Sequence, residues 1–142
     1  MRILGIDYGD RRTGLAVSDE GGLIASGLAT FECRKGDDRP LVEHIRALCE
    51  EYGVERIVVG LPINMDGRLG PRAQRTIEFA NRLRNALGLD VETWDERLTT
   101  EQADRLMLAA DLSRARRKRK RDAVAAHLIL QSYLDAQGQE DR

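Results

Sequence analysis

The feature that most constrains the fold is one carboxylate at the end of an apolar, strand-like run near the start of the chain. Residues 3–6 are apolar or glycine, Asp7 follows them, and a glycine-bounded turn occupies residues 9–14. This pattern predicts a buried strand, where an unpaired ionised carboxylate costs several kcal/mol. A metal ion, an arginine or backbone donors could offset that charge. The alternative is that Asp7 caps a hairpin turn at the strand end.

The first half of the chain predicts an antiparallel three-stranded meander followed by a helix and a crossover. Strand-like runs recur at residues 15–18 and 23–31 after short turn signals, which is typical of antiparallel neighbours. Residues 41–52 place apolar side chains at helical spacing before Gly53, a residue type common at helix ends. The continuous apolar run at 57–59 indicates a buried strand in the parallel part of a mixed sheet.

The second half predicts a helix, a fifth strand and a last helix. A turn-rich loop over residues 60–70 leads to a helix that Pro71 opens, and residues 89–94 form a strand parallel to the one before it. The last helix is expected over residues 123–134, with a frayed tail at 137–142. The fold class is therefore α/β, a five-stranded mixed sheet with an antiparallel meander and two parallel strands, flanked by helices.

A capping-box pair, Thr99 and Gln102, predicts one more helix between the fifth strand and the last helix.

Length, charge and cysteine content narrow the function classes. At 142 residues the chain is expected to be one domain, residues 1–142. A formal net charge of -1 gives no overall attraction to nucleic acid, so any such partner needs a local basic patch. Cys33 and Cys49 are far apart and suggest reduced core thiols rather than a zinc site or disulfide framework. Without a signal-peptide pattern or a long apolar run, we expect a soluble, cytoplasmic protein.

Three carboxylates on three separate elements form the candidate catalytic group: Asp7, Glu96 and Asp122. Side chains alternate along a strand, so only one of Asp95 and Glu96 can share the site of Asp7. Asp122 shares the apolar stripe of the last helix, although the helix macrodipole alone would also favour an acid at a helix start. Carboxylates without histidine or cysteine suit Mg²⁺ or Mn²⁺. Two such ions about 4 Å apart would support hydrolysis of a phosphodiester bond.

Two groups of basic residues are candidates for phosphate contacts. Arg68, Arg72 and Arg75 cluster around the start of the second helix, either as a solvated face or beside a bound phosphate. A basic run immediately precedes Asp122, either as a solvated loop, as a grip on a nucleic-acid backbone or, less in keeping with the rest, as a nuclear localisation patch. The nucleic-acid candidates in this run are Arg114, Arg116, Arg117, Lys118 and Lys120.

Four sequence blocks resemble the YqgF family of pre-16S rRNA nucleases, also called Holliday-junction-resolvase-like proteins. The blocks are Gly-Ile-Asp-Tyr-Gly at 5–9 with residues 12–19, Val-Gly-Leu-Pro at 59–62 with residues 64–67, residues 95–100, and Asp122 with residues 125–126 and 129–135. They occur in the family's order and span nearly the whole chain. The resemblance implies a ribonuclease H-like fold, a magnesium-dependent nuclease, and a bacterial cytoplasmic role in maturing the 5′ end of small-subunit rRNA.

Transferred position by position, the resemblance places the family's acids on Asp7, Glu96 and Asp122. It also marks Arg12 and Asn64 as nucleic-acid candidates, and Asp66 as a motif position without an assigned role. The segment before Asp122 is richer in arginine than the family's usual lysine-containing stretch, which affects the expected phosphate contacts and leaves the acid in place.

Three rival functions remain open at the level of sequence. An ATP-binding domain of the actin and sugar-kinase type also carries an aspartate in its first strand, but such proteins close a nucleotide between two domains. A non-catalytic RNA-binding assembly factor would use the basic run without the acids. A branched-DNA resolvase would use the same carboxylates, and resolvases usually act as symmetric dimers. The sequence leaves monomer and homodimer equally open.

Overall fold

In a computed structural model of the chain, the described residues are 1–34, 36–97 and 114–140, and in the last range the side chains are described from 124 to 138. The helix expected from Thr99 and Gln102 lies outside the described residues.

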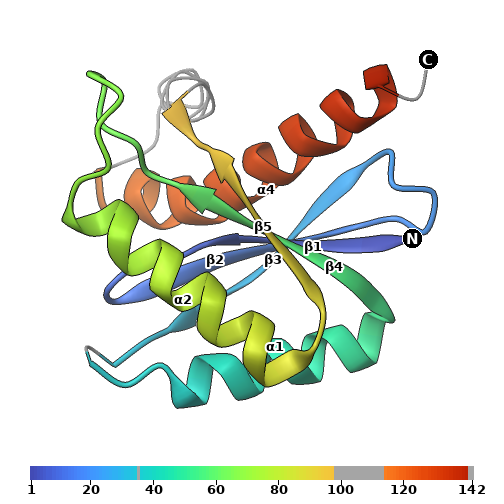
Figure 1. The fold of residues 1–142 in the computed structure, drawn as a ribbon, viewed down its shortest axis with the longest axis horizontal. Helices are drawn as coiled ribbons and strands as arrows, with labels where there is room; N and C mark the ends of the chain where they lie inside the picture. Colours follow the sequence, from blue (N-terminus) through green and yellow to red (C-terminus); the bar gives the residue numbers. More distant parts are fainter. Residues whose placement is uncertain (35, 98–113, 141–142) are drawn as a thin grey trace.

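The centre of the molecule is one five-stranded sheet (Figure 1). Its strands lie in the order β3-β2-β1-β4-β5. The β1–β2 and β2–β3 pairs are antiparallel, whereas β1–β4 and β4–β5 are parallel. This arrangement confirms the predicted meander with two added parallel strands. The bounds are β1 (Arg2–Asp7), β2 (Arg12–Ser18), β3 (Ala25–Glu32), β4 (Val54–Leu61) and β5 (Asp90–Asp95).

Helices cover both faces of the sheet and create two separate cores. The helices α1 (Arg39–Tyr52) and α2 (Pro71–Leu87) lie on one face, and α4 (Arg114–Glu140) lies on the other (Figure 1). The core beneath α1 and α2 includes Leu4, Ile6 and Phe79, all without solvent exposure. The core beneath α4 includes Val58 and Leu130. Successive residues of a central strand therefore point into different cores.

The ends of α1 and α2 follow from local sequence. Gly53 and Gly88 adopt left-handed conformations, with φ values of 66° and 67°, immediately after the two helices. Each donates its backbone N–H to a carbonyl in the last helical turn. Glycine adopts this conformation without the clash that a Cβ atom would cause, so both helices end where the sequence predicts.

Helix α4 is longer than the sequence analysis predicts. It begins at Arg114 and ends at Glu140, whereas the prediction was a helix over 123–134, a basic loop before it and a frayed tail from 137. The predicted loop is wrong because arginine and lysine are good helix formers, and charge alone does not end a helix. Asp122 is consequently eight positions inside the helix rather than at its start. The macrodipole acts mainly over the first turn, so it gives no reason for an acid there.

Within the described ranges, none of the helices combines the length and the apolarity that crossing a membrane requires.

Candidate active site

The carboxyl ends of the three parallel strands meet at one edge of the sheet. In the register of the sheet, Ile6 is opposite Val59, and Gly60 is opposite Trp94. Asp7, the last residue of β1, therefore lies level with Gly60, and Glu96 lies two positions beyond Trp94. The loops that leave such an edge commonly carry binding and catalytic residues in α/β proteins.

Asp7 and Glu96 also share one face of the sheet, the face covered by α4. Ile3 and Gly5 of β1 pack against α4, so alternation places the half-buried Asp7 on the same side. Glu96 reaches this side from beyond β5. A methyl group added to Gly60 would lie 2.7 Å from Glu96 Oε2 and 2.5 Å from Ile129 Cδ1 of α4. The Glu96 carboxylate therefore rests over the end of β4, between the two neighbouring strands.

Glu96 is held by its backbone and partly removed from water. Its N–H donates a hydrogen bond of 3.2 Å to the Leu61 carbonyl, which extends the pairing of β4 and β5 by one step. Burial raises the pKa of the Glu96 carboxyl, the charge of Arg72 opposes this rise, and the charge of Asp95 adds to it. Because this carboxylate is partly removed from water, a nearby positive charge is needed to stabilise its ionised form.

Asp95 does not share this environment. Its carboxylate accepts hydrogen bonds from the guanidinium of Arg97, the shortest 2.7 Å long, and these bonds hold the pKa of Asp95 below its usual range. Glu96 is thus the acid on the α4 side and Asp95 is occupied by a neighbouring cation. This geometry agrees with the expectation that Asp95 and Glu96 face opposite sides of the sheet.

The path of α4 carries Asp122 toward the same edge. Tyr133 accepts a hydrogen bond of 3.0 Å from Arg56 near the start of β4, while Ile129 packs at Gly60 near its end. The N-terminal half of α4 therefore runs toward the carboxyl ends of the strands, and position 122 precedes Ile129 by about two turns. The Asp122 side chain is outside the described part of the chain, and so are those of Arg114, Arg116, Arg117, Lys118 and Lys120. Convergence of all three acids stays a prediction.

No group of three or more His, Cys, Asp or Glu side chains with metal-binding geometry occurs among the described residues. Of the three predicted ligands, only Asp7 and Glu96 have side chains in this part of the chain.

Asn64 and Asp66 help to order the loop between β4 and α2. The Asn64 N–H donates to the Arg68 carbonyl at 3.0 Å, and Asp66 Oδ1 accepts the Arg68 N–H at 2.9 Å. The Asn64 amide packs against Gly70, the residue before α2. Arg12 begins β2 on the other side of β1, opposite Glu32 of β3. Arg12 and Asn64, two of the predicted nucleic-acid residues, therefore flank the ends of strands at the edge where Asp7 lies.

The sequence alone did not single out Arg72 among the three neighbouring arginines. The structure separates them: Arg68 pairs with Asp66 at 3.7 Å, Arg75 pairs with Asp10 at 3.8 Å, and Arg72 interacts with Glu96. The one sequence signal that could have favoured Arg72 over the other two arginines is its position in the first turn of the helix after the candidate site loop.

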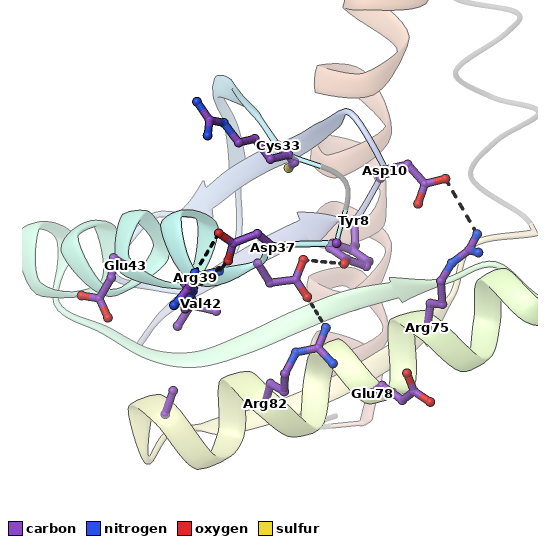
Figure 2. Close-up of a pocket in the computed structure, with 15 residues that line it drawn as sticks. Tyr8, Asp10, Cys33, Asp37, Arg39, Val42, Glu43, Arg75, Glu78 and Arg82 are labelled. Atoms are coloured by element: carbon purple, nitrogen blue, oxygen red, sulfur yellow. Dashed lines mark hydrogen bonds and ion pairs between the residues drawn. The ribbon is translucent and has the colours of Figure 1, made fainter.

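A pocket of about 890 Å³ lies on the opposite face, between α1, α2 and the end of β1 (Figure 2). Tyr8 donates a hydrogen bond of 2.7 Å to Asp38, which also pairs with Arg82. The Tyr8 ring stacks on Phe79 with a centroid separation of 4.1 Å, and burial raises the Tyr8 pKa. These contacts anchor the residue that follows Asp7, so the pocket side supports the position of the acid.

Comparison with known proteins decides the family. A family model described as "RuvX: Holliday junction resolvase" matches residues 1–136. The chain belongs to the RuvX family. A relative from Pelotomaculum thermopropionicum is 53% identical over 142 residues, covering 100% of this chain and 92% of the relative. One from Clostridium kluyveri is 50% identical over 135 residues, covering 95% and 97%. Both carry the name "Putative pre-16S rRNA nuclease".

Solved structures similar to this RuvX-family chain confirm the expected ribonuclease H-like fold. Thermus thermophilus RuvC, in complex with a Holliday junction substrate, has a TM-score of 0.59 and 19% identity, with 97% of each chain covered. The fowlpox virus Holliday junction resolvase has a TM-score of 0.60 and 12% identity, covering 96% of this chain and 99% of the other. At these identities the likeness supports the fold only.

Membership in the RuvX family confirms the resemblance and the expected class of enzyme, one that hydrolyses phosphodiester bonds. The competing assignment to an ATP-binding domain of the actin and sugar-kinase type is therefore wrong.

Proposed function

We propose that this chain is a divalent-metal-dependent nuclease that processes the 5′ end of pre-16S rRNA in the bacterial cytoplasm. The observation that carries the proposal is the placement of Glu96. Its desolvated carboxylate lies on the same face and at the same edge as Asp7, where the parallel strands end. Asp122, on the helix that runs toward this edge, is the third proposed acid.

The donor set fits Mg²⁺ or Mn²⁺. Both cations prefer oxygen ligands, and the candidate residues supply carboxylate oxygens from separate elements without a competing histidine or cysteine. Asp7, Glu96 and Asp122 would hold the ion. When bound, such an ion lowers the pKa of water and offsets charge on the scissile phosphate and the leaving oxygen.

The remaining roles belong to the basic and polar residues around the edge. Arg72 places positive charge beside Glu96 and is suited to a phosphate oxygen. Arg12 and Asn64 flank the edge from β2 and from the loop after β4. The basic run of α4 would contact the phosphate backbone, giving an affinity that depends on salt and little on sequence.

Pre-16S rRNA is the preferred substrate because relatives that are about half identical over nearly the whole chain carry that name. A Holliday junction is the second candidate, because the description of the matching family names that activity. The carboxylate chemistry does not distinguish the two, since it does not involve the 2′-hydroxyl. A resolvase would also be expected to act as a two-fold dimer, matching the symmetry of the junction.

One cleavage assay separates these functions. A labelled RNA spanning the 5′ leader and a four-way DNA junction are incubated with Mg²⁺ or Mn²⁺ and either wild-type protein or Asp7→Asn. We expect metal-dependent RNA cleavage that the variant loses while it still binds RNA. Cleavage of the junction alone by a dimeric protein would replace the rRNA substrate with branched DNA. RNA binding without any metal-dependent cleavage would contradict the nuclease proposal and indicate an assembly factor.

A further inference from the structure

We propose that Met65 is a substrate wedge, an apolar side chain that inserts between neighbouring bases of the nucleic acid beside the scissile bond. The inference rests on the proposed nuclease function and adds a specificity-determining residue to it. Met65 is 88% exposed, more than any other exposed large apolar side chain in the described residues, and Leu69 in the same loop is 46% exposed. Single exposed apolar residues are common, so the argument depends on how this one is held and where it lies.

The loop that carries Met65 is tied together on both sides of it. The Asn64 N–H donates to the Arg68 carbonyl at 3.0 Å, and the Gly67 N–H donates to the Asn64 carbonyl at 2.8 Å. Gly67 has a φ of 85°, which favours glycine, and Asp66 accepts the Arg68 N–H. The turn therefore fixes the backbone at Met65 and directs an apolar side chain into solvent, where it has no core to join.

The turn belongs to the loop that begins at the candidate active site. The loop follows β4, whose end lies between Asp7 at the end of β1 and Glu96 beyond β5. Figure 1 shows the loop projecting away from the sheet before the chain returns as α2. A substrate whose phosphate reaches Asp7 and Glu96 would therefore pass under or beside the tip of the loop.

The chemistry around Met65 matches a nucleic acid better than a protein surface. The Arg68 side chain is 86% exposed in the same loop and pairs with Asp66 at 3.7 Å, and Arg72, in the first turn of α2, lies near Glu96. Apolar wedges such as methionine and leucine, flanked by basic residues that contact phosphates, are a known means of unstacking a base step. Methionine suits the role because its flexible thioether adapts to irregular apolar surfaces.

The test uses a fluorescent base whose emission rises when it loses its stacking partner. Single 2-aminopurine substitutions are placed along the leader RNA and along the arms of the four-way junction. Binding is measured in the Asp7→Asn background so that the substrate stays intact, and cleavage is measured with Asp7 present. Met65→Ser removes the wedge, Met65→Leu preserves it, and Leu23→Ser, which changes a 68% exposed residue of the β2–β3 turn, is the matched control.

We expect fluorescence to rise at one or two adjacent positions on binding, and Met65→Ser to abolish the rise. Cleavage efficiency should fall about tenfold, equivalent to about 1.4 kcal/mol. Met65→Leu should restore both signals, and Leu23→Ser should change neither. The melting temperature should stay the same for all three variants, because the replaced side chains are exposed.

Unchanged fluorescence and cleavage in Met65→Ser, with cleavage still abolished by Asp7→Asn, would overturn the wedge and leave the nuclease proposal intact. A change in oligomeric state without a change in base fluorescence would overturn it in favour of a contact between protein copies. Wild-type protein that neither binds nor cleaves either substrate would overturn both proposals.

Discussion

At the residue scale, two glycines allow α4 to approach the sheet at the candidate site. A Cβ atom on Gly5 would lie 2.7 Å from Leu130 Cβ, and one on Gly60 would lie 2.5 Å from Ile129 Cδ1 and 2.7 Å from Glu96 Oε2. Contacts this short require the neighbouring atoms to move. Gly60 thus determines both how closely α4 packs and where the Glu96 carboxylate lies.

Gly60→Ala should reduce stability and activity together. Overpacking of a tight core costs about 1–3 kcal/mol, and here the displaced groups include a proposed metal ligand. We expect the free energy of unfolding in urea to fall by an amount in this range and cleavage to fall further than stability explains. Gly27→Ala in β3 is the control, because nothing lies within 4 Å of its added methyl group. Full activity in Gly60→Ala would contradict the placement of Glu96.

Asp19 predicts a pH dependence of stability that is separate from catalysis. Its carboxylate accepts the N–H groups of Ile24 and Leu23, at 3.0 Å and 2.8 Å, and these bonds hold its pKa below the usual range. A lowered folded-state pKa stabilises the protein above the unfolded pKa of about 3.9, and this contribution is lost as pH falls through the folded value.

Asp19→Ala should therefore be less stable than wild type near neutral pH, and the difference should shrink as pH falls below about 3.9. Urea unfolding at several pH values gives the free energy of unfolding of both proteins. A difference that stays constant down to the lowest pH would show that the ionised carboxylate is not the source of the stabilisation.

At the element scale, the strands and the first two helices could be predicted because their signals are local. Alternation and short turns indicated the meander, and Gly53 and Gly88 marked the helix ends. Alternation also indicated that only one of Asp95 and Glu96 can share the site of Asp7, but which of them does so depends on how β5 faces α4. The start of α4 was predicted wrongly because a run of like charges suggests a solvated loop, although arginine and lysine favour a helix.

The approach of Arg72 to Glu96 could not be predicted from spacing. Their separation depends on how α2 packs against β4 and β5, which is a tertiary distance that no local pattern encodes. The ordered turn around Met65 could not be predicted from the sequence either, because it depends on backbone hydrogen bonds across the loop.

The basic part of α4 should contribute to affinity through phosphate contacts. Replacing Lys118 and Lys120 by glutamine removes two proposed contacts. On single-stranded RNA, the slope of log affinity against log salt should become shallower by about 1.4, since each contact contributes about 0.7. Fluorescence anisotropy at several salt concentrations measures the slope. An unchanged slope, with helix content preserved by circular dichroism, would exclude these lysines from the interface.

At the scale of the whole molecule, one sheet separates a supporting core from the proposed catalytic face. Asp7 points toward α4, while the next residue, Tyr8, is anchored on the other side by Asp38 and by stacking on Phe79. The α1 and α2 side thus holds the end of β1 in place, and Glu96 lies on the α4 side, where we propose that Asp122 joins it. This arrangement makes the edge of the parallel strands the centre of the proposed activity.

The most direct test of that claim compares the two adjacent acids after β5. Glu96→Gln and Asp95→Asn each remove one charge at neighbouring positions, but only Glu96 lies over Gly60. Metal-dependent cleavage of the leader RNA should fall at least about 100-fold in Glu96→Gln, since even indirect partners of a bound metal are worth 10–100-fold. Asp95→Asn should retain most activity. Equal loss in both variants, or retained cleavage in Glu96→Gln, would contradict the proposed site.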